Sequence, residues 1–208
     1  MGEATDLELL SAWRDGDALA GNTLMERHYA AVLRFFALKV PRAAEDLAQK
    51  TFLGCVEGLE RLRSDASFKA YLFAVARRQL LWHLRDKQRD DSQRRPGGAP
   101  DDIGVPSGSA LLRSREEHLL LLRALVELPD ELQTILQLHY WEELDSGEIE
   151  EVIGVPRSTV RGRLARARER LAEQVGALGR GSPAATAIAA DLDGWTRAMV
   201  DPASRRTV

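Results

Sequence analysis

The strongest constraint on this chain is an acidic segment followed at once by a basic one, with a glycine between them, at residues 145–171. The first part begins with Asp145 and Glu148, which have the spacing of a capping box. Its apolar residues then recur at helical spacing, at Ile149, Val152 and Ile153. Gly154 follows, and glycine closes a helix at little steric cost. Two short amphipathic helices joined by such a turn are typical of a helix-turn-helix.

The second of these helices is basic on its outer side. Its apolar residues are spaced by four, three and four positions, at Val160, Leu164, Ala167 and Leu171. Six arginines lie between positions 157 and 170, and arginine both pairs with guanine edges and neutralises phosphates. We therefore expect duplex DNA to contact Arg157, Ser158, Thr159, Arg161, Arg163 and Arg166. The alternative is a solvated arginine-rich helix that pairs with the preceding acidic run.

Composition favours an all-α protein that acts through local rather than overall charge. The chain has 208 residues and a net charge of −3, so its bulk charge carries no nucleic-acid signal. Apolar residues make up 44% of the chain, with leucine and alanine prominent among them, and both favour helices. We predict two small helical domains joined by a flexible linker, the second a helix-turn-helix domain.

The expected boundaries follow from where apolar periodicity stops. Residues 87–110 lose that periodicity and contain three prolines and four glycines, which is the composition of a flexible tether. The predicted parts are a helical domain at residues 5–90, a linker at 91–112, the helix-turn-helix domain at 113–175, and a C-terminal extension of unassigned role at 176–208.

A segment in the first domain mixes aromatic and basic residues. Aromatic rings stack on unpaired bases while cations follow the backbone, which is how single strands are held. The candidate single-strand contacts are Lys69, Tyr71, Arg77, Arg78, Trp82 and Arg85. The alternative is that Tyr71 or Trp82 packs in a core, as we expect for Phe68, Leu72, Val75 and Leu80. In the helix expected over about 43–62, the predicted core residues are Leu47, Phe52, Val56 and Leu59.

Several other functions have no sequence support. Cys55 is the only cysteine, which fits a reducing cytoplasm, and its neighbours Leu53 and Val56 suggest core packing. The four histidines are dispersed, and no phosphate-binding glycine pattern occurs, so we expect no metal, cofactor or catalytic residues. No apolar run approaches the roughly 20 residues that a membrane span needs, so we expect no membrane insertion and a cytoplasmic location.

Four motifs together resemble the small, two-domain extracytoplasmic-function (ECF) group of bacterial RNA polymerase sigma factors. E-D-L-A-Q-K-T-F at Glu45–Phe52 is similar to the family motif E-D-L-V-Q-E-V-F. The stretch Phe68–Arg85 resembles F-R-A-W-L-Y-R-I-A-R-N, and Leu128–Tyr140 resembles L-P-x-x-x-R-x-V-L-x-L-x-Y. The helix-turn-helix completes the set. Each motif is degenerate alone, but four in this order are specific.

The resemblance implies a division of labour between the two domains. The first would bind the clamp helices of core RNA polymerase through Asp46, Gln49, Lys50 and Phe52, and would open the minus-ten element of promoter DNA. The second would dock on the polymerase flap and read the minus-thirty-five element. The resemblance also implies an anti-sigma factor, as for many members. The runner-up function is a stand-alone helix-turn-helix regulator that binds duplex DNA without polymerase.

Some positions depart from the family pattern. Lys50 replaces the usual Glu and reverses one charge at the implied clamp contact. Arg78 and Trp82 stand where Asn and Asp are common, which leaves the base preference at the minus-ten element open. Pro156 takes the place of a capping serine, and Gly162 that of a small polar residue. Gly162 either permits close backbone approach or costs about 1 kcal/mol of helix stability.

Overall fold

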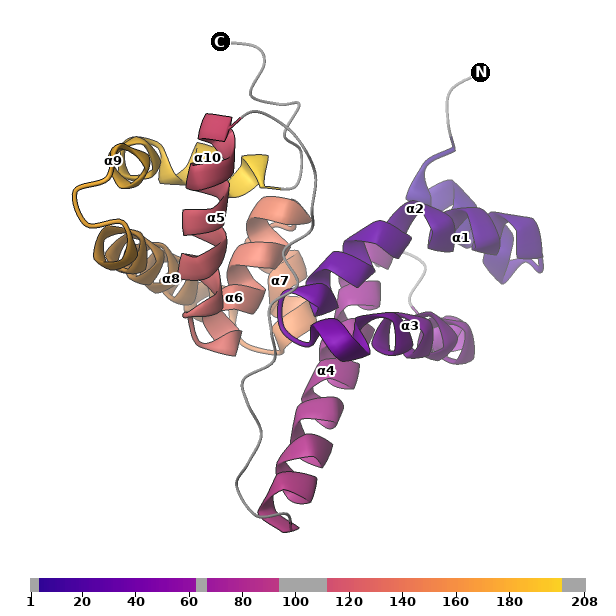
Figure 1. Cartoon of the computed structure of the whole chain (residues 1–208). Coiled ribbons are helices and arrows are strands. Elements are labelled where there is room, and N and C mark those ends of the chain that lie inside the picture. The colour runs from indigo at the N-terminus through magenta and orange to yellow at the C-terminus, as the bar shows by residue number, and fades with distance from the viewer. Residues whose placement is uncertain (1–3, 63–66, 94–111, 200–208) are drawn as a thin grey trace. The chain divides into compact units, whose positions relative to one another are not determined.

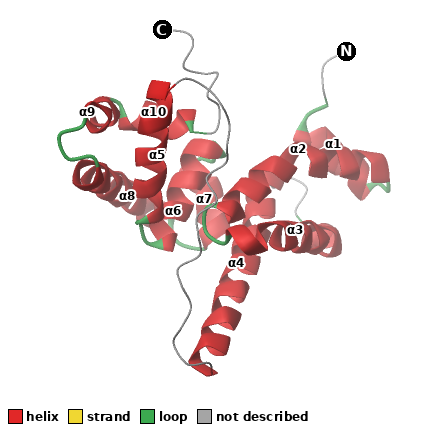
Figure 2. Ribbon diagram, viewed as in Figure 1, coloured by secondary structure: helices red, strands yellow, loops and turns green. Residues whose placement is uncertain are grey.

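The computed structural model describes residues 4–62, 67–93 and 112–199. Within these ranges all regular structure is helical (Figure 2), as the composition predicted. The chain divides into two compact units, built mainly from the elements before and after the undescribed residues 94–111 (Figure 1). The predicted linker falls largely on those residues and so lies outside the described part of the chain.

The described residues of the first unit form four α-helices and two short 3-10 turns. They are α1 (Asp6–Arg14), α2 (Ala18–Ala37), η1 (Pro41–Ala43), α3 (Ala44–Gly58), η2 (Leu59–Arg61) and α4 (Phe68–Gln93). The start of α1 is a capping box in which the Thr5 hydroxyl and the Glu8 carboxylate satisfy each other's backbone N–H groups. Asp17 caps α2 by accepting from two backbone amides. These local signals set where the helices begin.

A buried aromatic cluster holds the first unit together. Phe35 packs edge-on against Phe36 and Phe73, and all three rings are almost fully buried. Helix α1 is tied to α2 by the Asp6 carboxylate, which accepts from Arg27 and His28 at 2.6 Å each. Burial by itself raises the pKa of Asp6, but these two partners outweigh it and hold that pKa below the ordinary 3.8.

In the part of the second unit that the structure describes, there are six α-helices and one π-helical turn. They are α5 (Leu112–Val126), α6 (Asp130–Leu136), the π-turn η3 (Gln137–Trp141), α7 (Ser146–Ile153), α8 (Arg157–Leu178), α9 (Pro183–Ala190) and α10 (Leu192–Ala198). The predicted helix over about 130–140 is thus interrupted, because the Glu142 amide bonds to the Gln137 carbonyl five residues back. Helix α8 packs against α5 and α6.

The predicted turn between the two helices of the helix-turn-helix is confirmed. Gly154 has a φ of +70°, which L side chains rarely adopt. The four residues predicted to face inward on α8 are buried: Val160, Leu164, Ala167 and Leu171. The Asp145 carboxylate accepts from the Gly147 and Glu148 amides, as the capping spacing predicted.

Some helix ends and core positions differ from those predicted. Helix α4 continues to Gln93, and α8 continues past 175 to Leu178. Leu53 and Val56 are not core residues, since they are 59% and 49% exposed. Both lie on the side of α3 opposite Leu47 and Cys55, a placement that short apolar runs do not reveal.

Two glycines of the second unit give a matched test of backbone conformation. A Cβ added at Gly154 or at Gly162 meets no atom within 4 Å, so only the backbone angles differ. We expect Gly154→Ala to cost about 1–2 kcal/mol of unfolding free energy, because alanine is strained at positive φ. Gly162→Ala lies inside α8 and should stabilise by about 1 kcal/mol. Urea unfolding of the two variants measures both, and equal effects would contradict the assigned turn.

Candidate nucleic-acid interface

Helix α8 presents a basic side to solvent because its other side is buried. Of the six residues predicted to contact duplex DNA, five are exposed and Arg163 is half-buried. At 100° per residue, Arg157, Arg161 and Arg168 fall within about 40° of arc, so we call these three the arginine edge of α8. Ser158, Gly162 and Ala165 are exposed beside that edge. The structure thus brings the predicted set together on one helix.

Several arginines of α8 are tied to neighbouring acids. Arg163 pairs with Glu131 of α6 at 3.3 Å, and Arg170 pairs with Glu173 at 3.0 Å. Arg157 reaches back over α7, where a Cβ on Gly147 would come within 2.0 Å of its guanidinium. These contacts orient the arginines, and Arg161 and Arg166 remain exposed between them.

The start of α7 is an electrostatically stabilised cap next to Arg157. Hydrogen bonds from the Glu148 and Gly147 amides, with the charge of Arg157 nearby, lower the pKa of Asp145 from its ordinary 3.8. The Glu148 carboxylate in turn accepts from the Asp145 amide at 2.9 Å. The first helix of the motif is therefore fixed at the end that meets α8.

Helix α4 carries a second cationic row in the first unit. Spacings of seven, four and three residues place Tyr71, Arg78, Trp82 and Arg85 along one side of α4. Arg78 and Arg85 are exposed, and Trp82 is 58% exposed, so its indole is not a core residue. Arg89 continues the row by four residues, which the predicted set omitted. Lys69 and Arg77 are half-buried on other sides of the helix.

Tyr71 differs from Trp82 because it leans on α3. Its hydroxyl lies 3.5 Å from the carbonyl oxygens of Gly54 and Cys55, at the outer limit of a hydrogen bond. The side chain is half-buried, and a Cβ on Gly58 would come within 2.2 Å of that hydroxyl. The geometry gives Tyr71 a packing role between α3 and α4.

A third surface lies on α3. Asp46, Gln49 and Lys50 are exposed on it, together with the apolar side chains of Leu53 and Val56. Lys50 pairs with Asp46 at 2.6 Å, so the positive charge that Lys50 brings to this motif is partly neutralised by a neighbouring carboxylate of the same motif. Phe52 is half-buried and stacks on Tyr29 of α2, with ring centroids 6.0 Å apart. Exposed apolar residues next to polar ones are typical of a protein-binding surface.

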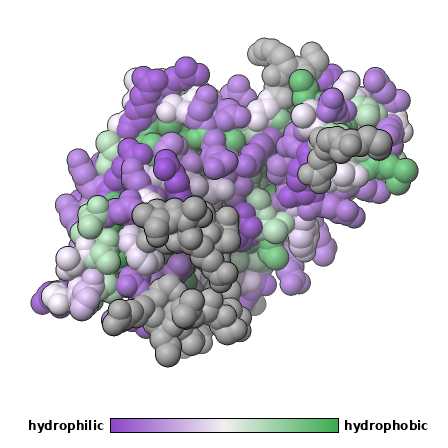
Figure 3. All heavy atoms as spheres, turned by 90° about the horizontal axis from the view of Figure 1, so that it is seen from above, coloured by the Kyte–Doolittle hydropathy of each residue, from purple (hydrophilic) through white to green (hydrophobic). Residues whose placement is uncertain are grey.

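Leu53 and Val56 are the residues of this surface that sequence reasoning missed. Their signal was present, because Leu53 lies four residues after Gln49 and Val56 lies seven residues after it, so both share the side of the helix that carries the polar motif residues. The face shown in Figure 3 is mostly hydrophilic, with apolar areas that are small and separate.

Metal-ligand groups and an accessible cysteine are both absent from the described residues. None of their His, Cys, Asp and Glu side chains form a group of three or more able to hold a metal ion. Cys55 is buried, and burial raises its thiol pKa to about 12, so no reactive thiolate forms at neutral pH. None of the described helices is both long and apolar enough to cross a bilayer.

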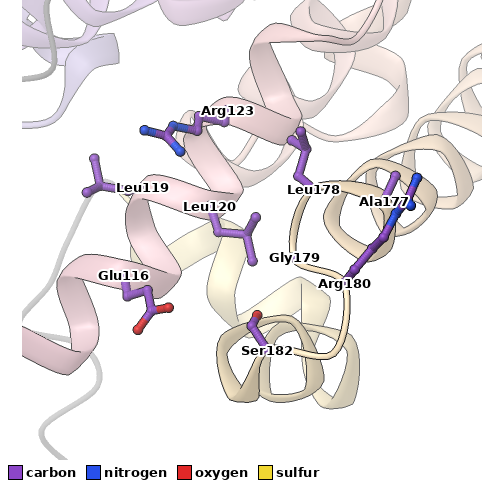
Figure 4. Close-up of a pocket in the computed structure, with 9 residues that line it drawn as sticks. All are labelled: Glu116, Leu119, Leu120, Arg123, Ala177, Leu178, Gly179, Arg180 and Ser182. Carbon is purple, nitrogen blue, oxygen red and sulfur yellow. The ribbon is translucent and has the colours of Figure 1, made fainter.

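A pocket in the second unit has the wrong chemistry for a small-molecule site. Helix α5 and the junction between α8 and α9 line it (Figure 4). Its walls include Leu119, Leu120 and Leu178, and the charged ends of Arg123 and Arg180 do not converge on one point. Ligand sites need polar groups that converge, so the exposed helix sides are the better candidates for function.

Comparisons with known proteins match both units. Residues 24–90 match the family model described as Sigma-70 region 2, and residues 118–171 match Sigma-70, region 4. The ECF RNA polymerase sigma-E factor of Escherichia coli (strain K12) is 28% identical over 184 residues, covering 83% of this chain and 95% of the relative. The sigma-E factor of Haemophilus influenzae is 26% identical over 184 residues, with 83% and 96% covered.

Two solved structures share the fold. CnrH in complex with the cytosolic domain of CnrY is 22% identical, with a TM-score of 0.58, and the match covers 83% of this chain and 97% of that one. RpoE in complex with the anti-sigma factor NepR from Bartonella quintana is 21% identical, with a TM-score of 0.59 and coverage of 74% and 95%. At these identities the likeness establishes the fold.

The packing of Tyr71 gives a sharp test of its role. Gly58→Ala should destabilise the first unit by about 1–3 kcal/mol, because the added methyl overlaps the Tyr71 hydroxyl. Tyr71→Phe removes the atom at 2.2 Å and leaves the next at 3.4 Å, an ordinary contact. The double variant should therefore regain most of the lost stability in urea unfolding. An additive double variant would contradict the docked position of Tyr71.

Proposed function

Because the chain belongs to the ECF sigma factors, which direct transcription initiation and are not enzymes, we propose that its two units contact separate parts of one promoter on core RNA polymerase. One observation carries the proposal. Each unit turns a cationic side of one helix to solvent, with Arg161 and Arg166 exposed on α8 and Arg78 and Arg85 on α4. Such sides bind phosphate backbones, and base contacts within them supply specificity.

Helix α8 is proposed to enter the major groove of the minus-thirty-five element. The buried stripe from Val160 to Leu171 fixes the helix in its unit, so the exposed residues move as one rigid set. Arg157, Ser158 and Arg161 lie at its N-terminal end, the part of a recognition helix that reaches base edges. Arg166 lies further along, where phosphate contact is the expected role. Thr159 and Arg163 complete the set on the other flank.

Helix α4 is proposed to hold the opened minus-ten element. Trp82 is the exposed ring of the row, and Arg78 and Arg85 flank it at four and three residues. A ring between two cations suits an unpaired base between two phosphates. Tyr71 supports the row from its docked place on α3, while Lys69 and Arg77 lie away from it and suit backbone contacts.

The exposed side of α3 is proposed as the polymerase contact. Asp46, Gln49 and Lys50 supply polar groups. Leu53 and Val56 supply apolar surface that is exposed to solvent in the free chain. Phe52 is held by Tyr29 and supports the surface from beside it. The Asp46–Lys50 pair presents both signs of charge, so the partner surface should not be uniformly basic.

The domain boundaries fit this division of labour. We propose residues 5–90 and 113–175 as the two binding domains, with 91–112 as the linker that joins them on one polymerase. Tethering makes the second contact intramolecular, so two weak contacts give a tight complex. Action on core polymerase places the protein in the cytoplasm. RpoE was solved in complex with the anti-sigma factor NepR, and CnrH in complex with the cytosolic domain of CnrY, so we infer that this chain also has an anti-sigma partner.

The experiment that tests the proposal is a gel shift with and without core polymerase. We expect promoter DNA to bind tightly only when the core enzyme is present, since each unit alone makes few contacts. The promoter is first found by in vitro transcription with start-site mapping. Equal binding by the free chain would favour the alternative, a stand-alone regulator, and no initiation with core enzyme would remove the proposal.

Arg161 is the residue whose loss should affect sequence reading most. We expect Arg161→Ala to cost about 1–3 kcal/mol of binding on the mapped minus-thirty-five element, because one bidentate base contact is lost. Arg170→Ala is the control, since Arg170 pairs with Glu173 on the opposite flank of α8. An equal loss for Arg161→Ala on scrambled DNA would mean that Arg161 contacts only phosphate.

A further inference from the structure

The C-terminal extension is a folded part of the second unit. Helices α9 and α10 lie beyond residue 171, where the region 4 match ends. The Trp141 indole donates to the Thr196 carbonyl at 2.9 Å, and the His118 and Trp195 rings meet edge-on at 6.0 Å. Thr196 and Ala198 are buried by this packing. The extension therefore has a defined seat against η3 and α5.

One carboxylate of the extension reaches the side of helix α8. The Tyr140 hydroxyl donates to Asp193 and accepts from the Nε of Arg168, whose Nε also lies 3.4 Å from the same Asp193 oxygen. The guanidinium groups of Arg168 and Arg197 lie 5.4 and 5.5 Å from the centre of the Tyr140 ring. An acidic oxygen is thus held by a hydroxyl and an arginine, with a second cation near.

This arrangement has the chemistry of a phosphate contact. Arginine and tyrosine hydroxyls are common donors to DNA phosphate oxygens, and a carboxylate oxygen is the closest side-chain equivalent of one. Burial, followed by the hydrogen bond to Asp193, raises the pKa of Tyr140 to about 12. The hydroxyl therefore keeps its proton at neutral pH and can donate to either oxyanion.

The position of Arg168 links the cluster to the rest of α8. Arg168 is the third member of the arginine edge, eleven residues after Arg157 and seven after Arg161. Arg157 and Arg161 are exposed, whereas Arg168 is half-buried and tied to Asp193 of α10. A DNA backbone that runs along the arginine edge beyond Arg161 would reach Arg168, whose charge is already paired with that of Asp193.

We propose that Tyr140 and Arg168 form a contact site for a DNA backbone phosphate, and that Asp193 occupies this site in the free chain. The inference rests on the proposed placement of α8 on duplex DNA. DNA and α10 then compete for one arginine, so the extension limits how strongly the second unit holds DNA of any sequence. The side chains of Arg168 and Asp193 are 38% and 50% exposed, and such ion pairs are weak enough for a phosphate to displace. Tyr140 is buried, so a phosphate reaches its hydroxyl only when Asp193 has moved away.

The test uses Asp193→Asn, which removes the charge and keeps the shape. Binding of the full chain to a fluorescent mixed-sequence duplex is measured by anisotropy over a range of salt. We expect the slope of log affinity against log salt to steepen by about 0.9, the value for one more phosphate contact. In an Arg168→Gln background the same change should leave the slope unaltered. Thermal unfolding checks that each variant is folded.

Glu127→Gln is the matched control, because it removes one negative charge from an exposed position on the same unit. A slope change in Asp193→Asn that equals the control, or that persists without Arg168, would show a general charge effect and overturn the proposal. An unchanged slope in Asp193→Asn would overturn it as well. If instead the wild-type chain with core polymerase fails to bind promoter DNA, the proposed function itself fails.

Discussion

The function of the second unit depends on the burial of one side of helix α8. Val160, Leu164 and Leu171 pack against α5 and α6, and this packing decides which arginines can face a ligand. A helix of 22 residues with so many like charges would be poorly stable alone, because repulsion along it opposes folding. Apolar contact on one side, and ion pairs to Glu131 and Asp193 on its flanks, offset that repulsion. Stability and charge display are therefore two results of the same packing.

The same logic holds in the first unit with different residues. Helix α4 buries Phe68, Leu72 and Leu80 against its neighbours, and so leaves the row with Arg78 and Trp82 in solvent. Each unit thus has a helix with one buried apolar side and one exposed cationic side. The difference between them is the exposed ring of Trp82, which suits an unpaired base, while α8 exposes only polar and small groups between its arginines. This chemical difference supports the proposed roles of the two helices, with α4 on single-stranded DNA and α8 on duplex DNA.

Sequence reasoning predicted the elements well where a local signal controlled them. The cap at Asp145 and the turn at Gly154 depend on neighbouring residues alone, and both were confirmed. It failed where tertiary packing decided the outcome. Val56 is apolar, as core residues usually are, but lies on the exposed side of α3. The sequence of the C-terminal extension did not indicate that it packs against η3. Of the candidate site, the shared side of α8 could be predicted from spacing, but the pairing of Arg163 and Arg168 with other helices could not.

The π-turn at residues 137–141 has a consequence for how chain length can vary here. The hydrogen bond that closes this turn joins residues five apart, where an α-helix joins residues four apart. Tyr140 and Trp141, at the end of the turn, both form hydrogen bonds to α10. Deleting one of residues 137–139 would restore regular winding and rotate both side chains by about 100° around the axis. A chain with a shortened turn would lose the hydrogen bonds from Tyr140 and Trp141 to α10, so we expect the irregular turn and the last helix to depend on each other.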